Sequence, residues 1–346
     1  MTPATPDEDV LVSVLVPVLD EAAVIQETAA AMRAQLVDGT VELLFVDGGS
    51  ADGTREQLAA LAAEDPSIRL LENPRQIVPA ALNVGLAAAR GRYVARMDAH
   101  SWYPPDYLAR GIERLERGDV TWVAGPAAPR GTGRWSRRVA LALASSLGQG
   151  GSRKWRGERA AAGDDEHDLD TGVFAGVWRR ETLERLGGWD ERFVVNEDAE
   201  MAARVLEDGG RIVCVAAMSA EYAPRETLRG LWRQYWRFGY FRVRTARLHP
   251  TAIRRPHLAA VALAATAAAT PAPGRLGRAA RAGIGLYSAA LVAVTVRARP
   301  EQPGDAVGVP VVLAVMHLSW GSGFLAACAR HGVPLKALVR AVRGGP

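Results

Sequence analysis

The stretch VELLFVDGGSADGT, residues 41–54, joins a mostly apolar, β-branched run to a turn rich in glycine and aspartate. The run Val41–Val46 has the length of a buried strand, and Thr54 opens a segment of helical composition. Asp52 and Thr54 both offer capping side chains at the start of that helix. A strand, a glycine turn and a helix in this order predict part of a βαβ unit.

The same alternation extends on both sides of this stretch through about the first 125 residues. It predicts an α/β fold with a mostly parallel sheet and helices on both faces, which binds ligands beyond the carboxyl ends of its strands. Gly91 is expected as a left-handed helix cap. The expected strands are Val10–Pro17, Val41–Val46, Ile68–Glu72, Tyr93–Met97, Val120–Ala124 and Arg211–Val215; the expected helices are Ala22–Leu36, Thr54–Ala63, Val78–Ala89, Asp106–Arg117, Arg138–Leu147, Thr182–Leu186 and Ala199–Leu206.

The net charge of +4 hides a difference between the two ends of the chain. Residues 1–221 carry 24 Lys and Arg against 35 Asp and Glu, whereas residues 222–346 carry 18 against 3. A basic, aromatic tail suits either nucleic acid or an anionic membrane. Long uncharged stretches inside the tail favour the membrane and argue against nucleic acid.

The tail consists of a basic aromatic helix, Leu228–Leu248, and three apolar segments, Leu258–Pro271, Gly283–Val296 and Val307–Ala329. Only the third has the length of a membrane span, and the first two fall short of about 20 residues. A soluble helical hairpin remains an alternative for the alanine-rich segments. Arginines flank all three segments on both sides, so the number of crossings stays open.

These patterns predict three regions: an α/β domain over 1–222, a basic interfacial segment over 223–256 and a membrane-associated helical tail over 257–346. The acidic segment Met1–Asp9 lacks the features of a signal peptide, which places the first domain in the cytoplasm at the plasma membrane. Two distant cysteines, Cys214 and Cys328, suggest neither a metal site nor a disulfide framework.

Acidic side chains follow two of the expected strands. Asp47 ends the VELLFV run, where its carboxylate can accept hydrogen bonds from a nucleobase or ribose, although an ordinary aspartate-capped turn explains the loop equally well. Asp98 and His100 follow the strand Tyr93–Met97. A carboxylate and an imidazole can hold a divalent cation that bridges a diphosphate. A turn cap and a surface histidine are the simpler alternative.

Two of the expected helices carry further candidate residues. Asp198 follows Glu197 at the start of a helix, where it can act as a base at the rim of a site, or be a plain acidic helix start. Gln234 and Arg237 share one face of the basic helix. Arg237 can bind a diphosphate there, or the helix can be an interfacial one whose arginines contact lipid headgroups.

Taken together, the ordered motifs resemble glycosyltransferase family 2, which has the GT-A fold, and within it transferases of the succinoglycan-biosynthesis type. The resemblance spans roughly residues 10–240. It rests on VSVLVPVLDE (12–21), ELLFVDGGSADGT (42–54), NPRQIVPAALNVGL (73–86), AALNVGLAAARGRYVARMD (80–98), ARMDAH (95–100), GGSR (150–153), DTGVF (170–174), GGWDERFVVNEDAE (187–200) and Gln234–Phe238.

The resemblance implies roles for these positions. Asp198 becomes the general base, and Asp98 with His100 the site of a divalent cation, Mn²⁺ or Mg²⁺. His100 stands where the family usually has a second aspartate, and Phe238 stands where its QxxRW element ends in tryptophan. The donor-binding residues implied are Pro17, Glu21, Asp47, Asn83, Asp98, Gln234 and Arg237.

The sequence therefore predicts an inverting hexosyltransferase. Its donor is expected to be a nucleotide sugar, a UDP-sugar first of all, and its acceptor a saccharide, polyprenyl-linked and seated at membrane lipids, in exopolysaccharide synthesis. A nucleotidyltransferase is the alternative enzyme, but the loop Pro17–Glu21 lacks its glycine-rich basic signature. A non-catalytic membrane scaffold has no need of strand-end acids.

Overall fold

The computed structural model describes residues 10–150, 152, 154, 165–298 and 302–343, so Met1–Asp9 and two residues of the GGSR motif, Gly151 and Arg153, lie outside it. The chain divides into two compact units, residues 1–128 with 156–222 and residues 129–155 with 223–346. We call them the first and second unit and describe each by itself.

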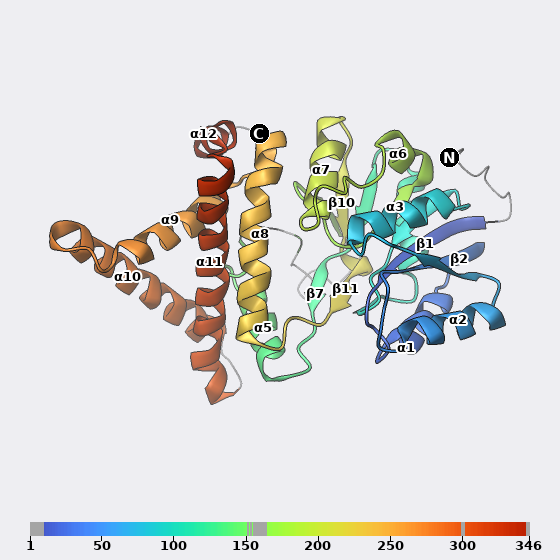
Figure 1. Ribbon diagram of the computed structural model, residues 1–346, viewed down its shortest axis with the longest axis horizontal. Helices are drawn as coiled ribbons and strands as arrows, with labels where there is room; N and C mark the ends of the chain where they lie inside the picture. Colours follow the sequence, from blue (N-terminus) through green and yellow to red (C-terminus); the bar gives the residue numbers. More distant parts are fainter. Residues whose placement is uncertain (1–9, 151, 153, 155–164, 299–301, 344–346) are drawn as a thin grey trace. The chain divides into compact units, whose positions relative to one another are not determined.

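The first unit is built from alternating strands and helices along most of its length (Figure 1). Its elements are β1 (Val10–Val18), α1 (Ile25–Arg33), β2 (Thr40–Asp47), α2 (Thr54–Glu64), β3 (Ile68–Glu72), α3 (Val78–Ala88), β4 (Tyr93–Arg96), β5 (Ser101–Trp102), α4 (Tyr107–Glu116), β6 (Trp122–Ala124), β7 (Ala127–Pro129), β8 (Glu166–Asp168), β9 (Gly176–Arg179), α6 (Arg180–Arg185), α7 (Glu197–Glu207), β10 (Ile212–Val215), the 3₁₀ turn η2 (Ala216–Met218) and β11 (Ala220–Tyr222).

An eight-stranded sheet in the order β3-β2-β1-β4-β9-β6-β10-β8 forms the centre of this unit. Its pairings are parallel between β1 and each of β2 and β4, between β2 and β3, and between β6 and β10. Strand β9 pairs antiparallel with both β4 and β6, and β8 pairs antiparallel with β10. The α/β fold with a mostly parallel sheet is therefore confirmed, and its parallel strands end at one common edge.

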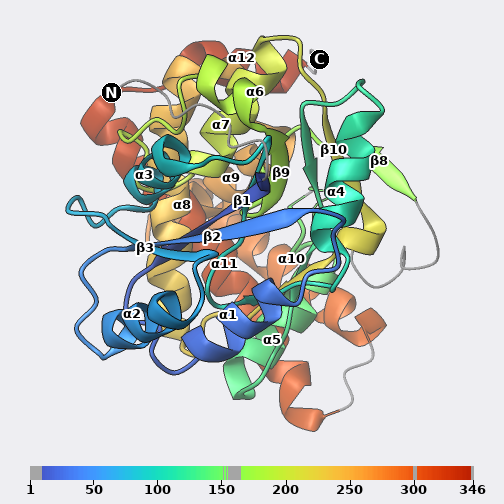
Figure 2. The same ribbon diagram turned by 90° about the vertical axis from the view of Figure 1, so that its right-hand side faces the viewer.

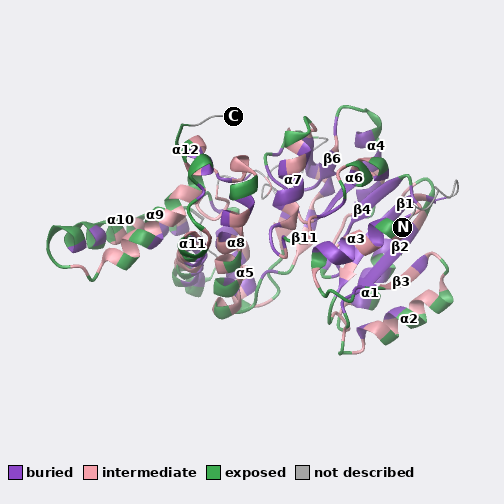
Figure 3. Cartoon of the chain, turned by 45° about the horizontal axis from the view of Figure 1, so that its top comes forward, coloured by how far each residue is buried: buried purple, intermediate pink, exposed green. Residues whose placement is uncertain are grey.

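Both faces of the sheet are covered, which explains why its central strands are nearly continuous apolar runs. Alternate residues of β1, among them Val14 and Val16, join a core cluster that includes Ile25 of α1 and Leu58 of α2. The opposite face meets α3, where Gly85 lies against Leu15. Figure 2 shows α3 on one side of β1 and β2 and the pair α1 and α2 on the other, and Figure 3 shows these strands as buried.

The structure adds strands that the sequence pattern did not indicate. β9 inserts between β4 and β6 from a later part of the chain, and β5, β11 and β7 form a separate three-stranded sheet. The expectation for Gly91 was wrong, because α3 ends in extended backbone at Ala89 and Gly91 has no positive φ. Gly91 instead packs against the backbone of Ser13, where a Cβ would come within 2.6 Å of the Ser13 nitrogen.

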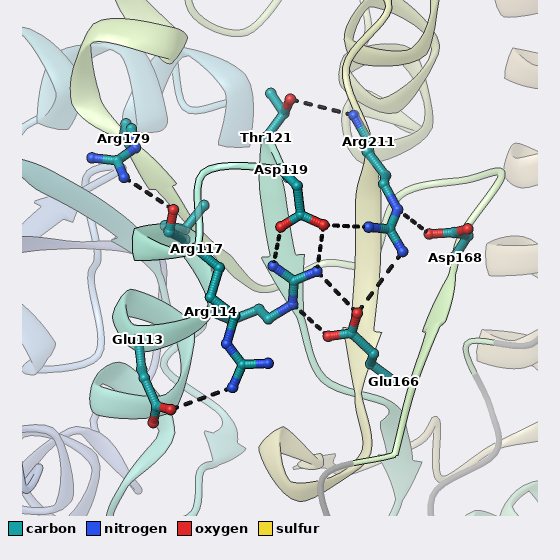
Figure 4. Close-up of polar contacts among 10 residues, drawn as sticks. Glu113, Arg114, Arg117, Asp119, Thr121, Glu166, Asp168, Arg179 and Arg211 are labelled. Carbon is teal, nitrogen blue, oxygen red and sulfur yellow. Dashed lines mark hydrogen bonds and ion pairs between the residues drawn. The ribbon is translucent and has the colours of Figure 1, made fainter.

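A buried arginine ties the short edge strand β8 to the rest of the sheet (Figure 4). Arg114 of α4 donates hydrogen bonds to both Asp119 and Glu166, and Arg211 pairs with Asp119 and Asp168. Asp119 and Arg211 precede β6 and β10, so they lie toward the amino edge of these strands. The Arg114 hydrogen bonds lower the pKa of Asp119 to about 2.

The second unit is helical. Its elements are α5 (Arg134–Ala144), α8 (Leu228–Leu248), the 3₁₀ turn η3 (Pro250–Ala252), α9 (Arg255–Ala269), α10 (Gly274–Ala298), α11 (Pro303–His331) and α12 (Leu335–Arg343). Helices α8 and α11 run side by side (Figure 1), and their backbones approach closely at glycines. A Cβ at Gly239 of α8 would come within 1.9 Å of the Trp320 carbonyl oxygen, and one at Gly323 of α11 within 2.0 Å of the Trp236 carbonyl oxygen.

The segment 129–155 lies within the 1–222 region of the sequence-based division and groups with the second unit in the structure. It packs with the second unit because α5 contacts α11 through a buried ion pair. The Nε of Arg138 lies 3.0 Å from Oδ1 of Asp305, and the two side chains expose 8% and 2% of their surface. The segments proposed as interfacial (223–256) and membrane-associated (257–346) both belong to this unit.

Two helices in the described part of the chain are long and apolar enough to cross a membrane, Gly274–Arg297 and Pro303–His331. The expected third span agrees with α11. The expected second apolar segment, Gly283–Val296, is shorter than helix α10. The helix begins earlier in the chain and includes Arg275, Arg278 and Arg281. Helix α9, at 15 residues, is shorter than a bilayer requires.

Candidate active site

The carboxyl ends of β2, β1 and β4 bring the first predicted acids to one edge of the sheet. Asp47 is the last residue of β2 and pairs with Val18 of β1, while Arg96, the last residue of β4, pairs with Leu15. Asp98 follows two residues later. Two strand spacings of about 4.8 Å separate β2 from β4, so the strand ends that lead into Asp47 and Asp98 are about 10 Å apart across the edge.

Asp47 is buried within the turn that it opens. Its carboxylate accepts hydrogen bonds from the backbone N–H of Gly49 and Ser50 and from the Ser50 hydroxyl, at 2.6 to 3.2 Å. Arg55 of α2 lies 3.5 Å away. The carboxylate thus stabilises the glycine turn. Because Asp47 is buried, a nucleobase reaches it only if the turn opens; otherwise the base binds the outer surface of the turn.

The loop after β1 is hydrogen-bonded to the turn that Asp47 opens. Backbone N–H groups of Asp20, Glu21 and Ala22 donate to the side chains of Ser50, Thr54 and Asp52, at 2.8 to 3.0 Å.

The Glu21 carboxylate extends from this loop to Nδ1 of His100, at 2.9 Å. Two of the predicted residues, Glu21 and His100, are therefore in direct contact, and the β1 loop joins the Asp47 turn to the Asp98 segment. Asp20 and Asp52 belong to this arrangement although the motif-based prediction left them out.

Arg96 connects the Asp98 segment to the start of α7. Its Nε lies 2.9 Å from Oδ1 of Asp98, its Nη2 3.3 Å from Oδ2, and its Nη1 3.1 Å from Oε1 of Glu197. Burial opposes the charge of this arginine, yet Asp98 and Glu197 outweigh that effect and raise the pKa of the guanidinium. Sequence reasoning missed Arg96; the signal available was a charged residue inside the apolar strand Tyr93–Met97.

Asp198 occupies the first turn of α7, directly after Glu197. Its Oδ1 accepts a hydrogen bond from the backbone N–H of Ala199 at 2.8 Å. Burial raises the pKa of the neighbouring Glu197; Arg96 opposes that shift and the Asp198 charge adds to it. The predicted base thus lies next to the carboxylate that shares Arg96 with Asp98.

Two other predicted donor-binding residues have structural contacts. Asn83 lies on α3, and its side-chain amide donates to the Trp189 carbonyl at 2.8 Å and accepts from the Trp189 N–H at 2.8 Å. It also donates to Glu191, so it fastens the loop of the GGWDE motif to α3. Pro17 lies in β1 opposite Val46. Direct donor contact by Asn83 or Pro17 stays a prediction.

Gln234 and Arg237 belong to the second unit. They lie one turn apart on α8, where Arg237 is exposed and Gln234 is half-buried. Tyr235 and Phe238 flank them and contact each other edge to face, with ring centroids 5.5 Å apart. A role in holding the diphosphate or the acceptor stays a prediction for both residues.

Asp98 and His100 are candidates to hold a cation that is shared with a ligand, and this role stays a prediction for both. Among the described residues, no group of three or more His, Cys, Asp or Glu side chains is arranged to hold a metal ion. Asp98 and His100 offer one carboxylate and one imidazole. Mg²⁺ and similar cations are commonly bound by one or two protein groups together with substrate phosphates, so these two residues suffice only when a diphosphate supplies the other ligands.

Comparison with known proteins identifies the family of the chain. The family model for Glycosyl transferase family 2 matches residues 13–185. The succinoglycan biosynthesis protein ExoA of Rhizobium meliloti is 33% identical over 316 residues, which cover 90% of this chain and 93% of the relative. The undecaprenyl-phosphate 4-deoxy-4-formamido-L-arabinose transferase of Pseudomonas aeruginosa is 34% identical over 147 residues, 40% of this chain and 43% of that protein.

A solved structure shares the fold. The mannosyltransferase PcManGT from Pyrobaculum calidifontis, determined in complex with GDP-Man and Mn²⁺, superposes with a TM-score of 0.59 at 22% identity, covering 100% of this chain and 91% of its own. The family match spans the strand ends that carry Asp47 and Asp98, and the similarity to ExoA extends over nearly the whole length of both proteins. The chain belongs to glycosyltransferase family 2.

Proposed function

We propose that this protein is an inverting glycosyltransferase that moves a hexosyl group from a nucleotide sugar to a hydroxyl of a polyprenyl-linked saccharide. The proposal depends on one observation: Asp98 and Glu197 both bind the guanidinium of Arg96. Because Asp198 follows Glu197, the predicted base lies beside the predicted donor-binding edge. The names of the relatives, a succinoglycan biosynthesis protein and an undecaprenyl-phosphate sugar transferase, support the acceptor class.

In the proposed reaction, Asp198 takes the proton of the acceptor hydroxyl while that oxygen attacks the anomeric carbon. The bond from the anomeric carbon to the diphosphate breaks on the opposite face, so the configuration inverts. A divalent cation at Asp98 and His100 supplies positive charge for the leaving diphosphate when it is bound. The Mn²⁺ and nucleotide sugar named with PcManGT support this choice of cofactor and donor class.

The second unit suits attachment to a membrane. Its helices α10 and α11 have the length and composition of spans, and the basic helix α8 carries arginines suited to anionic headgroups. We place the enzyme at the plasma membrane with its catalytic unit in the cytoplasm, where nucleotide sugars and the lipid-linked acceptor meet.

Replacement of the base tests the mechanism. Asp198→Asn keeps the size of the side chain but cannot take a proton, so transfer should fall at least 100-fold while affinity for the nucleoside diphosphate stays within about threefold. The matched control is Asp208→Asn at the other end of α7, where Asp208 pairs with Arg185 on the surface. The measurements are product formation and calorimetric titration of UDP and GDP with Mn²⁺. Unimpaired transfer by Asp198→Asn removes Asp198 from the base role.

A further inference from the structure

The contacts of Arg96 use all three nitrogens of its guanidinium. Nε and Nη2 bind the two oxygens of Asp98, and Nη1 binds Glu197. A guanidinium is planar and its N–H directions are fixed, so one arginine that binds two carboxylates also fixes the angle and spacing between them. A lysine in its place offers a single point charge without that fork.

Burial and hydrogen bonds hold the side chains of Arg96, Asp98 and Glu197 in a single arrangement. Arg96 exposes 4% of its surface, and the side chains of Asp98 and Glu197 expose 16% and 14%. The backbone N–H of Asp98 also donates to the Tyr103 hydroxyl at 2.7 Å, so this residue is held at both its main chain and its carboxylate.

Stability alone does not explain a charged residue at this position. Strand β4 lies between β1 and β9 with all four of its residues buried, and the other three are Tyr93, Val94 and Ala95. A hydrophobic side chain of similar volume fits such a strand, and replacing buried ion pairs by apolar residues is often neutral for stability. The partners of Arg96 are instead the residue predicted to bind the donor and the residue next to the predicted base.

We infer that Arg96 is a positioning residue that fixes Asp98 and the start of α7 relative to each other, and thereby sets the geometry between donor and base. The inference rests on the proposed function. Arg96 acts through Asp98 and Glu197, and the groups that hold a metal or ligating carboxylate in place commonly contribute 10- to 100-fold to metal affinity or activity.

Two variants of Arg96 and one matched control test this role in the full-length protein. Arg96→Met removes the guanidinium and should weaken Mn²⁺ binding in the presence of UDP or GDP about 10- to 100-fold, and lower kcat by a similar factor. Arg96→Lys keeps the charge, fills most of the volume and should recover part of both losses.

The control is Arg114→Met, which removes another buried arginine that binds two carboxylates, toward the amino edge (Figure 4). It should lower the melting temperature and leave Mn²⁺ affinity and kcat as in the wild type.

The outcomes separate this inference from the proposed function. If Arg96→Met and Arg96→Lys bind Mn²⁺ with the nucleotide as tightly as the wild type, or more tightly, and kcat is unchanged, the positioning role is overturned. Should Arg96→Met fail to fold, Arg96→Lys decides, because a purely structural arginine would show altered melting without a change in Mn²⁺ affinity. A wild-type protein that binds neither UDP nor GDP contradicts the proposed function itself.

Discussion

At the residue scale, the polar groups buried in the first unit make separate contacts at the two edges of its sheet. Glu42 is the one charged residue in the VELLFV run, and it is 1% exposed. It accepts hydrogen bonds from Ser13, from the guanidinium groups of Arg69 and Arg90, and from the Arg90 N–H. This cluster joins β1, β2 and the turn after α3, and it also explains the close approach of Gly91 to Ser13.

The Glu42 cluster predicts a pH-dependent contribution to stability. Burial alone raises the pKa of Glu42, but the hydrogen bonds from Ser13, Arg90 and Arg69 outweigh it and lower the pKa. A pKa that is lower in the folded than in the unfolded state stabilises the fold above the unfolded value, about 4.3, and this contribution disappears as the pH falls through the folded value. Glu42→Gln, which removes the charge from these hydrogen bonds, should therefore lower the free energy of unfolding by about 1.5–3 kcal/mol at pH 7 and by progressively less below pH ~4.

Thermal melting of the full-length protein in detergent, at several pH values, measures this cost. The control is Glu72→Gln, which removes an exposed carboxylate from the neighbouring strand β3, where it pairs with Arg55 on the surface. Surface pairs contribute about 0–1 kcal/mol, so this variant should melt near the wild type. A Glu42→Gln variant that melts like the wild type at pH 7 contradicts the assignment.

At the scale of elements, the local sequence pattern was sufficient for elements with a continuous and regular run of residues, whether or not both of their faces are buried. The strand Ile68–Glu72 and the helix Leu228–Leu248 have the predicted bounds. Strand β9 was missed because its four residues follow the DTGVF motif without a periodic pattern, and its partners β4 and β6 come from much earlier in the chain. Pairing at that distance is decided by packing of the whole sheet, which local composition does not encode.

The candidate spans α10 and α11 predict how the protein behaves in membrane fractionation. A helix of 29 residues with few charges has more than the length that a bilayer core requires, so the full-length chain should sediment with membranes. It should remain in the membrane fraction after washes with high salt and with alkaline carbonate, because burial of apolar surface is not weakened by ionic strength. Release by salt alone means that the basic helix α8 attaches the protein electrostatically without a span. A chain found wholly in the soluble fraction contradicts attachment.

At the scale of the whole molecule, the acids of the candidate site were predictable because each follows an expected strand or starts an expected helix. Asp47 and Asp98 needed only the rule that parallel strands end at a common edge. Arg96 was not predictable in this way, because its importance lies in two partners that are 2 and 101 positions away in sequence. The grouping of residues 129–155 with the second unit was likewise not predictable from chain order, because the Arg138–Asp305 ion pair joins residues 167 positions apart in sequence.

The central claim, transfer of sugar from a nucleotide donor at the carboxyl edge of the sheet, is tested most directly by donor consumption. Membranes that contain the full-length protein are supplied with Mn²⁺ and, in turn, with UDP-, GDP- and dTDP-sugars, and release of the nucleoside diphosphate is measured against membranes with Asp98→Asn. We predict that at least one donor is consumed and that Asp98→Asn lowers its consumption about 100-fold or more. Equal release by both proteins, or none from any donor, contradicts the account.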